Sequence, residues 1–131
     1  MKFYLKNLEN YFRGLSLQKF KEFEVIFAYA DSNDDTLNYI KSYQDDLNIK
    51  IIDNPRKDAE SGKALAIEKS IFDIVVLLDS DNEIMNDNWL SECKNIFSSH
   101  TNIVIIETDL YYNKNDNIYN RVCNLLRSSD V

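Results

Sequence analysis

The sequence predicts an α/β fold, a three-layer sandwich in which helices cover both faces of a mostly parallel sheet. Short apolar segments of strand length alternate with amphipathic segments of helical length along the chain. The strand-like segments are apolar on both faces, which is typical of parallel strands buried between helices. The chain has 131 residues, of which 44% are hydrophobic. We therefore expect a single domain over residues 1–131.

The first two elements are a helix and a strand. Near the N-terminus, four apolar residues recur at helical spacing, namely Leu5, Leu8, Phe12 and Leu15. Residues 14–16 are expected to end this helix. Residues 24–30, EVIFAYA, are apolar and partly β-branched, and they predict the first strand.

A second helix and a second strand follow. Residues 31–36, DSNDDT, supply turn and N-cap residues. The next helix carries one apolar face, formed by Leu37, Ile40, Tyr43 and Leu47. Residues 49–53, IKIID, predict a short strand that Asn54 and Pro55 end.

The alternation continues to the end of the chain. Residues 59–70 are compatible with a helix, and residues 73–78, DIVVLL, predict a third strand. The next helix has an apolar stripe of Trp89, Leu90, Cys93 and Phe97. Residues 102–107, NIVIIE, predict a fourth strand, and the last helix is marked by Ile118, Val122 and Leu125.

Composition excludes several classes of protein. Lys and Arg number 15 and Asp and Glu 22, so the net charge is −7. This balance argues against nucleic-acid binding and against adhesion to anionic lipid, because both need a basic face. No apolar run reaches the roughly 18 residues of a membrane span, so we expect neither a signal peptide nor a transmembrane helix. Cys93 and Cys123 lie in helix-like segments and predict thiols of a cytoplasmic protein, not a disulfide or a zinc site.

Asp79 and Asp81 follow the third predicted strand, at the edge where parallel sheets bind ligands. In an extended chain, residues two apart point the same way, so their carboxylates repel each other unless a cation compensates. A hard divalent cation would do so and would leave positions open for phosphate and water. The alternative is that both are solvated loop acids that cap the helix near Trp89. The first interpretation predicts a site for a hard divalent cation.

Two further residues are candidates for ligand binding. Asp31 is the first residue beyond the first predicted strand and can accept a hydrogen bond from a nucleobase N–H or a ribose hydroxyl. The acids that follow it, Asp34 and Asp35, predict turn and N-cap chemistry instead. Lys63 follows a glycine near a helix start and can approach phosphate, although it can also be a solvated lysine. The single histidine, His100, lies in a predicted turn and supports neither a nucleophile relay nor a zinc site.

Three stretches in order resemble the nucleotide-binding half of a glycosyltransferase family 2 enzyme of the GT-A fold. Residues 8–36, LENYFRGLSLQKFKEFEVIFAYADSNDDT, are similar to the family's first helix, second strand and acidic turn. Residues 62–70, GKALAIEKS, resemble its glycine-lysine helix. Residues 73–90, DIVVLLDSDNEIMNDNWL, resemble its metal-binding strand, its DxD motif and the Trp-Leu that opens the next helix.

The resemblance implies a metal-assisted, inverting transferase that takes a sugar from a nucleoside-diphosphate sugar. Asp79 and Asp81 match the DxD motif, which is expected to bind Mg²⁺ or Mn²⁺ and, through it, the donor diphosphate. Asp31 lies within the family's nucleoside-contacting turn, and Lys63 matches a position near the donor. No residue is assigned as catalytic base; Glu107 and Asp109 follow the fourth predicted strand at the same edge of the sheet.

The sequence also departs from the family pattern. Tyr29 and Ala30 stand where the family commonly has an acidic pair, and Glu68 and Ser70 replace an asparagine and a glycine of the glycine-lysine helix. The family's first strand, expected before Leu5, and its acceptor-binding half are not visible. We therefore expect a chain truncated at both ends that binds donor weakly and lacks turnover. Its sheet would lack a central strand, and a homodimer could cover the open edge.

Two other functions fit parts of the sequence. A phosphatase of the haloacid-dehalogenase type also ends an apolar strand in DxD, with the first aspartate as nucleophile. That motif sits on the first strand, however, and Glu83 stands where Thr or Val is usual. The other alternative is a non-catalytic binding or assembly module, which a measurement of molecular size in solution would distinguish.

Overall fold

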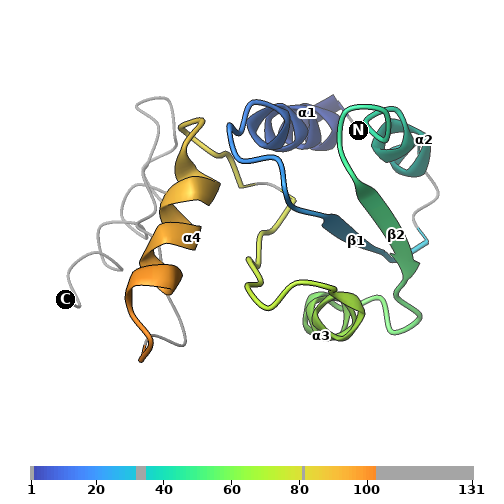
Figure 1. Ribbon diagram of the computed structural model, residues 1–131. Coiled ribbons are helices and arrows are strands. Elements are labelled where there is room, and N and C mark those ends of the chain that lie inside the picture. The colour runs from blue at the N-terminus through green and yellow to red at the C-terminus, as the bar shows by residue number, and fades with distance from the viewer. Residues whose placement is uncertain (1, 32–34, 81, 103–131) are drawn as a thin grey trace, which may run out of the picture. The chain divides into compact units, whose positions relative to one another are not determined.

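The structure is a computed structural model that describes residues 2–31, 35–80 and 82–102 (Figure 1). The described elements are two strands and four helices: α1 (Lys2–Ser16), β1 (Val25–Tyr29), α2 (Thr36–Lys41), β2 (Ile49–Asp53), α3 (Ala59–Lys69) and α4 (Trp89–Ser99). The chain divides into two units, Met1–His100 and Thr101–Val131. All the described elements belong to the first unit. The prediction of one domain over residues 1–131 stays a prediction.

β1 and β2 form a parallel pair, as the apolar strand pattern predicted. The register runs from Val25 opposite Ile49 to Tyr29 opposite Asp53. Asn54 extends the pair by one bond, because its backbone N–H donates to the carbonyl of Tyr29 at 2.8 Å. The α/β class with a parallel sheet is thus confirmed. Two strands are too few to establish the predicted three-layer sandwich.

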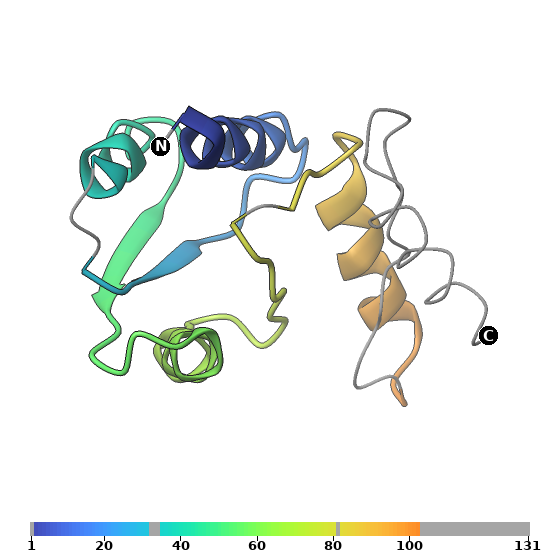
Figure 2. The ribbon, with the colours of Figure 1, turned by 180° about the vertical axis from the view of Figure 1, so that it is seen from behind.

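Helices lie on both faces of this strand pair. Figures 1 and 2 show α1 and α2 on one face and α3 on the other. The core under α1 and α2 is apolar and aromatic: the ring of Phe12 stacks on Tyr43 at 4.8 Å between centroids and on Phe27 at 6.4 Å. Its buried members are Leu8, Tyr11, Phe12, Leu15, Val25, Ile40, Leu47 and Ile49.

α3 approaches the opposite face closely because a glycine lies at the contact. A Cβ atom on Gly62 would lie 3.2 Å from the Cβ of Ala28 and 2.9 Å from Nδ2 of Asn54. The helix starts at an N-cap in which Oδ1 of Asp58 accepts the N–H of Ser61 at 2.7 Å. That bond satisfies one of the free N–H groups of the first turn.

The four predicted helices that fall within the described residues are found, with one difference in length. α1, α3 and α4 cover the stretches that helical spacing indicated. α2 ends at Lys41, before Tyr43 and Leu47 of its predicted apolar face. After Lys41 the backbone tightens into turns, in which the N–H of Tyr43 donates to the carbonyl of Ile40 and the N–H of Gln44 to that of Lys41, each at 3.1 Å.

The prediction of a third strand over residues 73–78 is wrong. These residues have no strand partner among the described residues and are not part of the sheet. The apolar side chains of Ile74, Val75, Val76 and Leu77 remain 37–53% exposed. An apolar, β-branched run becomes a strand only when another strand pairs with it. Among the residues that the structure describes, β1 is paired on one side only, by β2.

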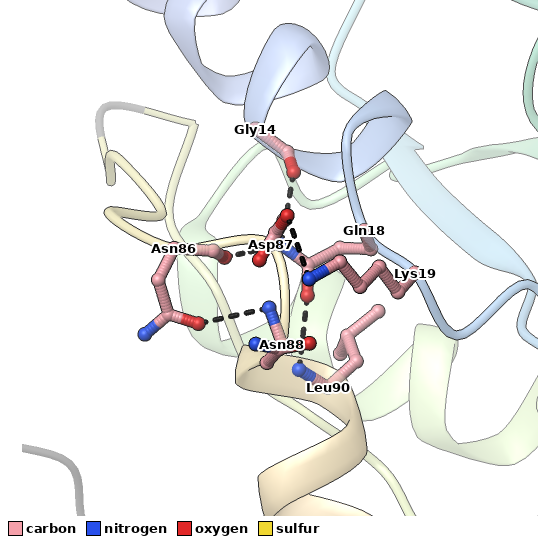
Figure 3. Close-up of polar contacts among 7 residues, drawn as sticks. All are labelled: Gly14, Gln18, Lys19, Asn86, Asp87, Asn88 and Leu90. Carbon is pink, nitrogen blue, oxygen red and sulfur yellow. Dashed lines mark hydrogen bonds and ion pairs between the residues drawn. The ribbon is translucent and has the colours of Figure 1, made fainter.

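One buried side chain fastens the end of α1 to the start of α4 (Figure 3). Gln18 is 1% exposed. Its Nε2 donates to the carbonyls of Gly14 at 3.1 Å and Asn86 at 2.7 Å, and its Oε1 accepts the N–H of Leu90 at 3.0 Å. Asn88, the N-cap of α4, makes no side-chain cap bond. Gln18 therefore supplies the cap from another part of the chain.

Lys19 and Glu24, in the connector between α1 and β1, also bind the segment that joins α3 to α4. The N–H of Lys19 donates to the carbonyl of Asp87 at 2.8 Å, and the side chains of the two residues form an ion pair at 3.2 Å. Oε1 of Glu24 accepts the N–H of Ile71 at 2.8 Å. The connector between α1 and β1 thus touches both sides of the segment that joins α3 to α4.

The remaining sequence predictions concern the end of the chain and the membrane. The predicted fourth strand at residues 102–107, except Asn102, and the last helix lie outside the described residues, as do Glu107, Asp109 and Cys123. None of the helices in the described part of the chain has the length and apolar character needed to cross a membrane.

Candidate functional site

A cavity of about 620 Å³ lies beside β1. Its walls come from α1, the connector between α1 and β1, β1, α3, the first turns of α4 and the segment of residues 72–80. Most of the lining is apolar, and its polar and charged side chains include those of Asn54, Lys63, Asp79, Glu22, Glu24, Asp73 and Lys94. An apolar cavity with a few converging polar groups is the usual form of a small-molecule site.

Lys63 and Asp79 meet in the wall of this cavity. The Nζ atom of Lys63 lies 3.0 Å from Oδ1 of Asp79, and the two side chains are 30% and 58% exposed. The hydrogen bond and the negative charge of Asp79 raise the pKa of Lys63, so the ammonium stays charged. The structure thus brings together two residues that the sequence analysis had placed near the same ligand for separate reasons.

A tight turn positions Asp79. Its backbone N–H donates to Oδ1 of Asn82 at 2.8 Å, and the N–H of Asn82 donates back to the carbonyl of Asp79 at 2.9 Å. These two bonds fix the backbone around the carboxylate. Lys63 is positioned by α3, which begins four residues earlier at Ala59.

Tyr11 is a site residue that the sequence analysis missed. It comes from α1, is 7% exposed and lines the cavity. Burial, and then the charge of Asp79, raise the pKa of Tyr11 to about 12. The phenol therefore stays neutral near neutral pH and can donate a hydrogen bond. Tyr11 follows Leu8 by three residues and precedes Leu15 by four, so helical spacing could have placed it on the buried face.

Asn54 is a second residue that the sequence analysis did not place in the site. It follows β2, is 5% exposed and lines the cavity next to Gly62. Its Nδ2 donates to the carbonyl of Asp58 at 2.8 Å, which orients the amide. Its Oδ1 has no hydrogen-bond partner within the described residues. The sequence pattern Asn-Pro indicated only the end of a strand.

Asp31 lies outside this group. It follows β1 with a φ of 55°, in the left-handed region, and its side chain is 83% exposed. Its Oδ2 lies 3.4 Å from Nζ of Lys57, which also has a positive φ, of 57°. Asp31 does not line the cavity that Lys63 and Asp79 share. The predicted site residues therefore form two groups in the structure.

The predicted metal site rests on residues that the structure describes only in part. Asp81 lies outside the described residues. Within residues 2–31, 35–80 and 82–102, no three His, Cys, Asp or Glu side chains are placed to hold one metal ion. Asp79 has the right chemistry, an accessible carboxylate on the cavity wall, but Lys63 already neutralises it. A single paired carboxylate does not make a metal site.

The other residues considered from the sequence are placed as follows. Cys93 is a buried free thiol, and burial raises its pKa, which disfavours the reactive thiolate. Asp35 is the N-cap of α2 but makes no side-chain cap bond, and Asp34 lies outside the described residues. The ring of His100 contacts the carbonyl of Ile96 at 3.1 Å, at the end of α4.

Comparison with known proteins gives one match. The model of the family described as Glycosyl transferase family 2 matches residues 3–128. No curated protein and no solved structure gives a significant match.

Proposed function

The chain belongs to glycosyl transferase family 2, and we propose that its cavity binds a nucleoside-diphosphate sugar whose sugar is transferred to an acceptor. One observation supports this use of the cavity above all: the contact of 3.0 Å between Lys63 and Asp79 in its wall. A chain of net charge −7 needs a local cation to hold a diphosphate, and Lys63 provides one.

In this proposal each residue of the cavity has a distinct task. The ammonium of Lys63 binds a diphosphate oxygen and leaves its partner carboxylate as the phosphate arrives. Tyr11 donates a hydrogen bond from its neutral phenol to the ligand in the cavity. The turn closed by Asn82 keeps the carboxylate of Asp79 aimed into the cavity.

We propose that Asp79 and Asp81 together are the ligands of Mg²⁺ or Mn²⁺. Two carboxylates separated by one residue supply the hard oxygen atoms that both cations prefer. Such a cation would supply Lewis-acid stabilisation of the diphosphate leaving group.

Asp31 is proposed to contact the ribose or the base. Its carboxylate is 83% exposed, and its pairing with Lys57 is a solvated ion pair at 3.4 Å. Such pairs contribute little to stability, so a ligand hydroxyl or N–H can replace Lys57 at small cost.

The proposed fold is GT-A and the proposed reaction is inverting. In an inverting transfer, a carboxylate takes the proton of the acceptor hydroxyl as that oxygen attacks the sugar carbon in line with the leaving diphosphate. No residue is assigned to this role. The haloacid-dehalogenase alternative gains no support from the family match, whereas the binding-module alternative predicts nucleotide binding without turnover.

Calorimetric titration with UDP and with GDP, with and without Mn²⁺, tests this proposal. We expect binding of one nucleotide that needs Mn²⁺ and that is lost in Asp79→Asn and in Asp81→Asn. Asp45→Asn is the matched control, since it removes the same charge from an exposed position outside the cavity. Equal binding by all variants, or no binding by the parent chain with Mn²⁺ present, contradicts the proposal.

A further inference from the structure

We propose that Asp31 and Lys57 together bind the edge of the donor's nucleobase and select a base that carries a ring N–H next to a carbonyl group. Uracil and guanine have such an edge, whereas cytosine and adenine do not. The inference rests on the proposed function, because it concerns the base of the same nucleotide. It makes Lys57 a specificity-determining residue, a role that the sequence pattern did not indicate.

Asp31 and Lys57 share a backbone conformation that a side chain disfavours. Their φ angles are 55° and 57°, and among the residues that the structure describes they are the two non-glycine residues with a positive φ. A Cβ atom makes this left-handed region costly, whereas glycine adopts it freely. The fold therefore spends stability on keeping two charged side chains at these positions.

The contact between the two side chains does not offset this cost. Oδ2 of Asp31 lies 3.4 Å from Nζ of Lys57, and the side chains are 83% and 56% exposed. Exposed ion pairs of this kind contribute little to stability. Glycine, which is favoured at the last position of common β-turns, would adopt the conformation of Lys57 without strain. Strained residues that bring no structural gain cluster at ligand sites, so the pair is placed to bind a ligand.

The pair lies at the edge of the sheet where a nucleotide is expected. β1 and β2 are parallel, so the turns that follow them lie at the same edge, and parallel sheets bind ligands there. The turn that contains Lys57 begins at Asn54, whose backbone carbonyl accepts the N–H of Lys57 at 3.1 Å. Asn54 also lines the cavity that holds Lys63. A nucleotide with its diphosphate at Lys63 can thus place its base beside the pair.

The charges of the pair determine which base edge fits. A ligand that separates the two side chains must offer a hydrogen-bond donor to the carboxylate and an acceptor to the ammonium. A ring N–H beside a carbonyl offers both along one rigid edge, and both hydrogen bonds are charge-assisted. In cytosine and adenine the ring nitrogen is an acceptor and an amino donor replaces the carbonyl. The same edge would then turn a lone pair to the carboxylate and an amino group to the ammonium.

The preference between matched nucleotides tests this assignment. Calorimetry in the presence of Mn²⁺ compares UDP with CDP, and GDP with ADP. The parent chain should bind the nucleotide with the ring N–H at least about tenfold more tightly than its amino counterpart. Lys57→Gln should reduce this ratio by at least about threefold, and Lys57→Arg should keep most of it.

Arg56→Gln is the matched control for the loss of charge. Arg56 belongs to the same turn and is 78% exposed, but its side chain pairs with Asp58, at 3.8 Å, and not with Asp31. This variant should leave the preference between the bases unchanged. An equal loss of preference in Arg56→Gln and in Lys57→Gln would assign the effect to the net charge of the turn and overturn the inference.

Lys57→Gly separates binding from a structural role. It relieves the strain at φ 57° and should raise the midpoint of urea unfolding. The same variant should weaken the binding of UDP or GDP by at least about threefold, because the ammonium is lost. A lysine that served only the fold would not change the two quantities in opposite directions. Unchanged nucleotide binding in Lys57→Gly overturns the inference.

Two further results distinguish this inference from the proposed function. Binding of nucleotides by the parent chain without preference between the bases overturns the inference and leaves the proposed function intact, whereas no binding of any nucleotide with Mn²⁺ present overturns both. The 2′-deoxy forms of UDP and GDP examine the ribose. If the effect of Lys57→Gln disappears with them, the pair binds the ribose and not the base, and the inference is wrong.

Discussion

The ammonium of Lys63 and the carboxylate of Asp79 face each other at 3.0 Å, although one comes from α3 and the other from the segment that follows it. The pair stands in the wall of an otherwise largely apolar cavity. In the absence of a ligand, Lys63 therefore pairs with the carboxylate of Asp79, which the proposed donor site needs. Its replacement should act on cation binding and on nucleotide binding in opposite directions.

Lys63→Gln should strengthen the binding of Mn²⁺ alone, because the carboxylate of Asp79 is then no longer neutralised by a lysine. The same variant should weaken the binding of the metal–nucleotide complex by about tenfold, because a charge-assisted contact to phosphate is lost. Calorimetry with Mn²⁺ alone and with Mn²⁺ plus UDP or GDP measures both effects. Lys41→Gln, an exposed lysine on α2, is the control. A change of the same sign in both titrations contradicts the expectation.

Gln18→Leu should lower the free energy of unfolding by about 2–4 kcal/mol. The side chain is 1% exposed, and its loss leaves the carbonyls of Gly14 and Asn86 and the N–H of Leu90 without their partner. Urea denaturation measures the change. Gln44→Leu is the control, because its side chain makes one bond, of 3.2 Å, to the carbonyl of Ile49. Equal effects of the two substitutions would falsify the role assigned to Gln18, which is to fasten the end of α1 to the start of α4.

Gly62→Ala should destabilise the fold by about 1–3 kcal/mol, although alanine is the better helix former by about 1 kcal/mol. The new methyl group would lie 2.9 Å from Nδ2 of Asn54 and 3.2 Å from Cβ of Ala28, so α3 must move away from the sheet. Thermal and urea unfolding give the sign. Ala64→Gly, at an exposed position of the same helix, should cost about 1 kcal/mol through propensity alone. A gain of stability in Gly62→Ala would show that the contact is not tight.

Stability should fall in acid as Asp58 is protonated. The bond from the backbone N–H of Ser61 is the main cause that lowers the pKa of Asp58 below its ordinary value of 3.8. A carboxyl with a depressed pKa in the folded state stabilises the fold above the ordinary pKa, and this contribution is lost as pH falls through the folded value. Melting temperatures between neutral pH and about pH 3 follow it.

Asp58→Asn separates the charge from the cap. Asparagine still accepts the N–H of Ser61 but does not titrate, so this variant should lose less stability in acid than the parent chain. Asp58→Ala should be less stable at neutral pH as well. If Asp58→Asn shows the same acid dependence as the parent, other carboxyl groups are responsible for it.

The helices were predictable because their signal is local. The spacing of Leu8, Phe12 and Leu15 already defines the buried face of α1. In α4 the predicted apolar stripe contains the buried Cys93 and the half-buried Leu90. The strand at residues 73–78 was predicted wrongly because strand formation depends on a neighbouring strand, which a local pattern does not reveal.

The candidate site was predictable only in part. Lys63 and Asp79 were recognised, but their contact depends on how α3 packs against the sheet. Asp31 is directed elsewhere by a backbone with positive φ and by Lys57, neither of which its sequence context shows. Gln18 and Asn54 are polar residues in loop-like sequence that the fold buries, and burial of this kind depends on distant partners.

The connector between α1 and β1 has an unusual position in the chain, because Gln18, Lys19 and Glu24 hold backbone on both sides of residues 72–85. The length of this connector therefore determines the distance between the end of α3 and the start of α4. An insertion of a single residue between Lys19 and Glu24 would prevent Lys19 from reaching Asp87 while Glu24 still binds Ile71. Extra residues between Phe72 and Asp73, which lie between the two bound segments, would only enlarge a loop. Insertions should therefore be far less tolerated in this short connector than in the longer segment it holds.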